Sequence, residues 1–237
     1  MNKKIILSVA VLIIISGAVY FAFNNQNENP QIINNSQSDN QEFVCNQNNN
    51  QFRKSTGLII SDELKEKYNN QIKEIINSEE ENSEKYFNLA MLYRNIDDLE
   101  KSCEMFVKSV ELNENNFLAL SGLGTVFQEM QDYKQAEKAF KKAIEINPKH
   151  INTYSKIAFL YKANPNKTKE EIIEFYEDAI LKTSGDVNLA REYASYLEEV
   201  KEYKKAIEIW EALIEREGDA TGEIQNRIDE LRQKIGE

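Results

Sequence analysis

The hydrophobic pattern divides the chain into a continuous apolar stretch, a polar segment and a long region of helical periodicity. Residues 5–23 run for 19 residues without a charged side chain, directly after Lys3 and Lys4. A helix of this length spans about 28 Å, close to the ~30 Å hydrocarbon core of a bilayer. The pattern therefore predicts one N-terminal transmembrane helix, which we assign to residues 1–23 as an uncleaved anchor.

The same stretch has one alternative interpretation, a cleaved signal peptide. The small residues Ser16, Gly17 and Ala18 lie where a signal peptidase cuts, although the apolar run continues beyond them. If the segment stays in the membrane, the two lysines before it place the N-terminus in the cytoplasm by the positive-inside rule. We then expect a single-pass protein of the cell membrane with the rest of the chain extracytoplasmic.

Residues 24–60 are expected to be an Asn/Gln-rich flexible linker. Residues 24–50 hold eleven asparagines and five glutamines and show no apolar period that could form a core. Two short apolar groups, residues 43–45 and 57–60, interrupt the linker. They could pack on the folded part, but incidental residues within a tether are the favoured interpretation.

A repeat with a period of 34 residues follows. The residues that define it, in a unit beginning at Phe117, are Leu120, Leu123, Gly124, Phe127, Tyr133, Ala136, Phe140, Ala143 and Pro148. Chemically similar residues recur 34 positions earlier, at Tyr86, Leu89, Ala90 and Tyr93, and 34 positions later, at Tyr154, Ile157, Ala158 and Tyr161. Each unit reads as two amphipathic helices joined by a short turn, so the pattern predicts an all-α protein.

This pattern resembles the tetratricopeptide repeat, in which W-x₂-L-G-x₂-Y is followed by A-x₃-F and then by Pro. The unit 117–150 fits almost throughout, and degraded units occupy 83–116, 151–186 and 187–220. The resemblance implies a right-handed α-solenoid of four helix-turn-helix repeats over residues 83–220. Gly124 lies in the middle of a helix, where we expect it to permit close approach of a neighbouring helix.

Single helices are predicted on both sides of the repeats. Residues 61–82 include apolar positions at helical spacing that match a lone second helix, so they are expected to form an N-terminal capping helix. Residues 221–237 carry one apolar stripe on an otherwise charged helix, as expected of a C-terminal capping helix.

Composition limits the function classes. The formal net charge is −11, which argues against nucleic acid as a partner because phosphate contacts need Lys and Arg. The chain has one histidine and two cysteines, too few for a histidine metal motif or a four-ligand zinc site, and it has no Walker or hydrolase motif. We therefore expect no cofactor, no metal and no enzymatic activity. His150 is expected to be exposed.

The pairing of Cys45 with Cys103 stays open. The two could form a disulfide in an oxidising compartment, but nothing in their spacing requires it. Cys103 shares a helical stripe with Leu99 and Phe106, which favours a partly buried apolar role.

The resemblance also implies a concave groove lined by the first helix of each repeat and able to hold a peptide or a partner helix. Carried onto this sequence, the lining residues are Phe87, Met91, Arg94, Leu118, Ser121, Thr125, Gln128, Asn152, Ser155, Phe159, Lys162, Asn188, Arg191, Ser195 and Glu198. Family members that clamp a terminal carboxylate use Lys and Asn on the first repeat. Phe87 and Met91 stand at those places here, which puts that specificity in doubt.

The expected function is therefore a membrane-tethered, extracytoplasmic scaffold that binds a protein or peptide partner and assists assembly of an envelope or secretion complex. Two alternatives stay open. One is a self-associating structural scaffold, and the other is a secreted soluble binding protein released after Ala18.

Overall fold

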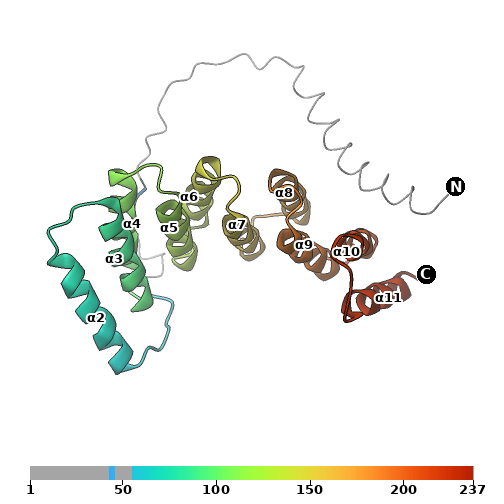
Figure 1. Cartoon of the computed structure of the whole chain (residues 1–237), viewed down its shortest axis with the longest axis horizontal. Helices are drawn as coiled ribbons and strands as arrows, with labels where there is room; N and C mark the ends of the chain where they lie inside the picture. Colours follow the sequence, from blue (N-terminus) through green and yellow to red (C-terminus); the bar gives the residue numbers. More distant parts are fainter. Residues whose placement is uncertain (1–42, 46–54, 237) are drawn as a thin grey trace, which may run out of the picture. The chain divides into compact units, whose positions relative to one another are not determined.

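The computed structural model describes residues 43–45 and 55–236, and within them the regular secondary structure is entirely α-helical (Figure 1). The helices are α2 (Asp62–Ile76), α3 (Ser83–Asn95), α4 (Leu99–Leu112), α5 (Phe117–Glu129), α6 (Tyr133–Ile146), α7 (Ile151–Ala163), α8 (Lys169–Lys182), α9 (Val187–Glu199), α10 (Tyr203–Glu217) and α11 (Glu223–Ile235). The all-α prediction is confirmed for this part of the chain.

The turns within helix pairs share one local design. Asp97, Gln131 and Lys201 each have a positive φ, between 63° and 67°, and each directly precedes the N-cap residue of the next helix. Asp98 and Asp132 then cap α4 and α6 by accepting a hydrogen bond from a backbone amide in the first turn. An Asp at this position satisfies a donor that has no partner within the helix, so the sequence fixes where each second helix begins.

The larger compact unit, Phe43–Tyr193, is built by stacking consecutive helices. Each helix from α3 to α8 packs against the next one along the chain, and α3 contacts α5 as α5 contacts α7. The repeat residues form the core: Leu89, Leu123 and Ile157 are at most 2% exposed. The period of 34 therefore brings equivalent apolar side chains into one continuous row between the helices.

Gly124 has the role expected from its position in the repeat. A Cβ atom at this residue would lie 2.6 Å from Cδ1 of Phe140, whose ring is completely buried. The absence of a side chain therefore allows α5 to approach α6 closely.

Helix α2 packs against α3, the first helix of the first repeat, in the manner of the second helix of a preceding repeat. Ile72 is buried in one cluster with Tyr86 and Leu89 of α3. Ser61 caps the helix by accepting a hydrogen bond from the Leu64 amide. The packing agrees with the expected position of the N-terminal cap.

The second compact unit is described over Ala194–Gly236 and contains α10 and α11. The two helices pack against each other, and Ile228 and Leu231 of α11 are each 1% exposed. Trp210 of α10 is also buried and lies beneath the guanidinium of Arg227. The apolar stripe of α11 is thus covered, as a capping helix requires.

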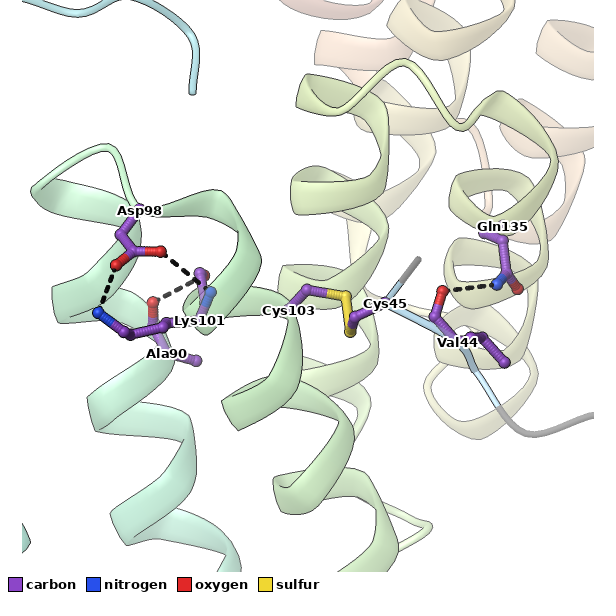
Figure 2. The surroundings of a disulfide bond; sticks show 8 residues. Val44, Cys45, Ala90, Asp98, Lys101, Cys103 and Gln135 are labelled. Carbon is purple, nitrogen blue, oxygen red and sulfur yellow. Dashed lines mark hydrogen bonds and ion pairs between the residues drawn. A yellow bond between two sulfur atoms is a disulfide. The ribbon is translucent and has the colours of Figure 1, made fainter. Parts of the chain in front are cut away.

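Two pieces of the expected linker are packed on the repeats, contrary to the favoured interpretation of its apolar groups. Cys45 forms a disulfide with Cys103 on α4 (Figure 2). Phe43 is 8% exposed. Further along, residues 55–58 surround the side chain of Asp97 with hydrogen bonds. The fold thus settles the open cysteine pairing, and Cys103 is a disulfide partner rather than a free apolar residue.

The predicted transmembrane helix and most of the predicted linker lie outside the described residues. Among the helices that the structure describes, none has the length and apolar character needed to cross a bilayer. The anchor at residues 1–23 therefore stays a prediction.

Candidate peptide-binding groove

The first helices of three successive repeats lie side by side. α3 contacts α5, and α5 contacts α7, so the predicted groove residues of these helices share one face of the larger unit. A hydrogen bond from Ser155 Oγ to Glu192, with an O–O distance of 2.8 Å, extends the row to the first part of α9. The repeat order thus places the helices that carry most of these predicted residues next to one another.

The middle of this face exposes large apolar side chains. Leu118 on α5 is 45% exposed and Phe159 on α7 is 60% exposed. Polar members of the predicted lining are also accessible: Asn152, Lys162, Asn188 and Arg191 are exposed, whereas Thr125 and Gln128 are half-buried. Water-exposed apolar side chains of this size often mark a binding surface on a soluble domain.

Phe87 and Met91 on α3 are placed differently from the expected open lining. Both are half-buried. The ring of Phe87 meets Phe106 edge-on with a centroid distance of 5.8 Å, and Met91 lies in a small pocket beside Gln71 and Ile75 of α2. The capping helix therefore occupies the side of α3 on which the sequence placed the start of the groove.

The polar part of the face is a cluster of charges that sequence reasoning found only in part. Arg94 of α3 donates from Nε to both carboxylate oxygens of Glu129 on α5, at 3.1 and 2.9 Å. Lys156 of α7 donates to Ser121 Oγ at 3.1 Å. Glu129 and Lys156 were not among the predicted groove residues. Each lies one residue after a predicted position, Gln128 or Ser155.

The charges of this cluster are unbalanced. Burial lowers the pKa of Lys156, and the nearby Arg94 lowers it further, while Glu129 acts in the opposite direction. The hydrogen bonds that Arg94 donates to Glu129 raise the pKa of Arg94 above its usual value. Glu129 is thus paired with Arg94, whereas the described hydrogen bond of Lys156 goes to the neutral Ser121.

A cavity of about 340 Å³ lies at the α3 end of the face. Its polar wall includes Arg94 and Glu129, and its apolar wall is formed by the segment before α2 and the start of that helix, at Leu58, Ile59, Ile60, Leu64 and Tyr68. The segment before α2 therefore closes the groove at one end.

His150 is half-buried rather than exposed, so that expectation is wrong. Its ring meets Phe117 edge-on at a centroid distance of 4.9 Å, and its Nδ1 lies 2.7 Å from Thr153 Oγ1. Burial lowers its pKa, and the positive charge of Lys156 lowers it further. The histidine begins α7 and belongs to the polar network beside the groove.

The remaining predicted groove residues lie in the second unit. Ser195 is exposed. Glu198 is half-buried and accepts hydrogen bonds from Trp210 Nε1, at 2.6 Å, and from Arg227. These two bonds give Glu198 a structural role within its own unit.

The described residues hold no group of three or more His, Cys, Asp or Glu side chains that could bind a metal ion. The polar atoms of the face are hydrogen-bond donors, acceptors and fixed charges.

Comparison with known proteins agrees with the repeat pattern. Two family models, both described as tetratricopeptide repeat, match residues 84–116 and 117–150. Two solved structures, titled "Crystal structure of MamA" and "Crystal structure of MamA protein", are similar to this chain at 20% sequence identity and a TM-score of 0.53. The alignments cover 68% and 65% of this chain and 96% and 85% of those chains.

At this identity the two structures establish similarity of fold alone. A search of curated protein sequences finds no match. The family is established by the two matched repeats together with the buried repeat residues and the paired helices described above. Residues 84–116 and 117–150 of this chain are therefore tetratricopeptide repeats.

Proposed function

We propose that this protein is a membrane-tethered, extracytoplasmic scaffold that binds a partner protein or peptide along the face formed by α3, α5 and α7, and that it assists assembly of an envelope or secretion complex. Tetratricopeptide repeats form protein-interaction scaffolds. The tether, the compartment and the assembly role are the parts of the proposal that go beyond the family.

The exposed pair Leu118 and Phe159 carries the proposal. These side chains lie on adjacent first helices and keep 45% and 60% of their surface exposed, whereas the equivalent rows on the packing side are buried. Burial of such side chains by a partner is worth about 1.5–3 kcal/mol each. Each of these two side chains thus offers an apolar contact of the kind that dominates interfaces.

The neighbouring charges indicate the chemistry of the bound segment. Arg94 is paired with Glu129 and Lys156 donates to the neutral Ser121, so a segment with an apolar side chain and a nearby Asp, Glu or terminal carboxylate would complement the face. Such a carboxylate would accept a charge-assisted hydrogen bond from Lys156.

The disulfide supports the extracytoplasmic location. Cys45 and Cys103 are joined, and disulfides persist in oxidising compartments and are rare in the cytosol. This agrees with the orientation expected from Lys3 and Lys4 before the apolar stretch.

Self-association is the second candidate, because the segment before α2 is also apolar and exposed. Leu58 is 63% exposed and Ile59 is 96% exposed. A second copy of the chain that packed against Leu58 and Ile59 would remove their apolar surface from water, which would stabilise a dimer. Light scattering of the detergent-solubilised full chain distinguishes the candidates, since a stable dimer at micromolar concentration would favour self-association.

The binding proposal is tested with the double variant Leu118→Ser/Phe159→Ser in the full-length protein. Crosslinking in native membranes followed by affinity capture should recover the partner with the native chain and at least tenfold less with the variant. The matched control is Leu112→Ser/Leu181→Ser, because these residues are 49% and 45% exposed on second helices. Undiminished capture by the first variant, or equal loss in the control, would refute the groove.

A further inference from the structure

A short segment near the N-terminal end of the described chain is bound like a peptide ligand. Phe43, Val44 and Cys45 contact residues of α4, α5 and α6: Cys103, Phe127, Gln135, Lys138 and Lys142, which we call the Phe43 seat. The bonded cysteines are 58 residues apart in sequence. Figure 2 shows two of the links of this segment to the helices, the disulfide and the hydrogen bond from Gln135 to Val44.

The seat has the chemistry of a site for an aromatic side chain. The ring of Phe43 lies 6.1 Å from that of Phe127, and the ammonium groups of Lys138 and Lys142 lie 5.4 and 5.3 Å from the ring centroid of Phe43. Cations at this distance are attracted to the face of an aromatic ring. Phe43 is consequently buried, although it belongs to no helix.

The non-covalent contacts of the segment are few. Val44 is 54% exposed, and its carbonyl accepts one long hydrogen bond, 3.3 Å from Gln135 Nε2. Among the described contacts, one buried ring with its two neighbouring ammonium groups and one weak hydrogen bond must offset the loss of conformational entropy of three residues. The disulfide therefore decides whether the seat stays filled.

We propose that the Phe43 seat is a second peptide-binding site, separate from the groove, which the chain fills with its own Phe43–Cys45 segment, and that the Cys45–Cys103 disulfide is a redox-controlled latch that keeps it filled. Reduction by an external dithiol breaks the S–S bond and gives two thiols, while the dithiol becomes a disulfide. The two electrons and two protons come from the dithiol. The freed segment then leaves the seat.

Opening the latch would also change where the domain is attached, a consequence that rests on the proposed membrane tether. With the latch closed, the described contact nearest to the predicted anchor is the one made by Phe43. With the latch open, it is the hydrogen bond from the Ser55 hydroxyl to Asp97, 12 residues further along the chain. Reduction would therefore move this described attachment point away from the predicted anchor along the chain.

The latch is tested by the accessibility of Cys103 in full-length variants. Cys103 is completely buried, and its sulfur faces the segment through the disulfide. In Cys45→Ser the segment should leave, so that Cys103 reacts with iodoacetamide at a rate within threefold of the rate in Phe43→Ala/Cys45→Ser, measured by mass spectrometry. Circular dichroism verifies the fold of each variant.

A rate at least threefold faster in the double variant would show that Phe43 holds the segment without the disulfide, which would overturn the latch. An unreactive Cys103 in both variants would also overturn it, because the segment would then not control access. Val44→Ala/Cys45→Ser is the matched control, since Val44 projects away from the seat and should leave the rate unchanged.

Recognition by the seat is tested separately with a synthetic peptide of residues 39–47. Under mild oxidation it should form a mixed disulfide with Cys103 of the Cys45→Ser protein, at least fivefold faster than the same peptide carrying Phe43→Ala. The oxidised native protein should capture neither peptide. Equal capture of both peptides would refute an aromatic site. Because neither measurement involves the groove or a membrane, failure here is distinguishable from failure of the proposed function.

Discussion

The carboxylate of Asp97 accepts two hydrogen bonds from Thr56, one from its backbone amide and one from its hydroxyl, each with a donor–oxygen distance of 2.7 Å. The amides of Gly57 and Leu58 donate to the other carboxylate oxygen at 2.9 and 3.1 Å. Asp97 itself has a φ of 63° and occupies the turn between α3 and α4. One side chain thus joins the first repeat to the segment that leads into the capping helix.

Asp97 should make stability depend on pH in the acid range. Desolvation opposes ionisation, but the hydrogen bonds from Ser55, Thr56 and Gly57 outweigh it and lower the pKa to about 2. An unfolded Asp has a pKa of about 3.9, so the folded state is favoured above that pH, and this contribution is lost as the pH falls through about 2.

The test compares urea unfolding of the native chain with Asp97→Asn, because Asn tolerates a positive φ and removes the charge together with one of the two acceptor oxygens. The native chain should be more stable at pH 7, and the difference should vanish toward pH 2. Asp178→Asn on α8 is the control. A difference that does not change with pH would assign the effect to geometry rather than to charge.

Gly124→Ala should destabilise the protein although Ala favours helices. The new methyl group would lie 2.6 Å from the ring of Phe140, and overpacking of a core costs about 1–3 kcal/mol. The gain in helix propensity is only about 1 kcal/mol. We expect a lower melting temperature by circular dichroism, with rescue when Phe140→Leu is added. An increase in melting temperature in the single variant would contradict the close approach of α5 and α6.

Reduction of the Cys45–Cys103 disulfide should lower the free energy of unfolding by about 2–4 kcal/mol. The bond closes a loop with a sequence separation of 58, which restricts the unfolded chain. Urea titrations with and without reductant measure the difference. Cys45→Ser serves as the control because reductant should not affect it; identical midpoints for the native chain in both conditions would contradict the prediction.

Removal of residues 223–237 should expose the apolar surface of α10. Ile228 and Leu231 are each 1% exposed against it, and burying such a side chain is worth ~1.5–3 kcal/mol. Trp210 is the single tryptophan of the chain and lies under Arg227, so its fluorescence should shift to longer wavelength in the truncated protein. Unchanged emission and an unchanged melting temperature would show that α11 is not a cap.

The sequence alone determined the helices and the repeat order. Apolar residues at a 34-residue period identify which faces pack, because an equivalent residue in each repeat meets the same environment. Some contacts between adjacent repeats join residues that are about one repeat length apart in sequence. Arg94 and Glu129 are 35 positions apart, and their pairing follows once the first helices are adjacent.

Only the tertiary structure decided which parts of the non-repeating sequence pack, and where. Residues 43–45 and 55–58 have no periodicity, so nothing local indicates that Phe43 finds Phe127 or that Thr56 finds Asp97. The same holds for Phe87 and Met91, whose helix positions predict an open groove until α2 and Phe106 are placed beside them. A helical pattern predicts only which residues are neighbours within a turn of the same helix. Contacts between residues about 40 to 90 positions apart in sequence form only when the helices are stacked.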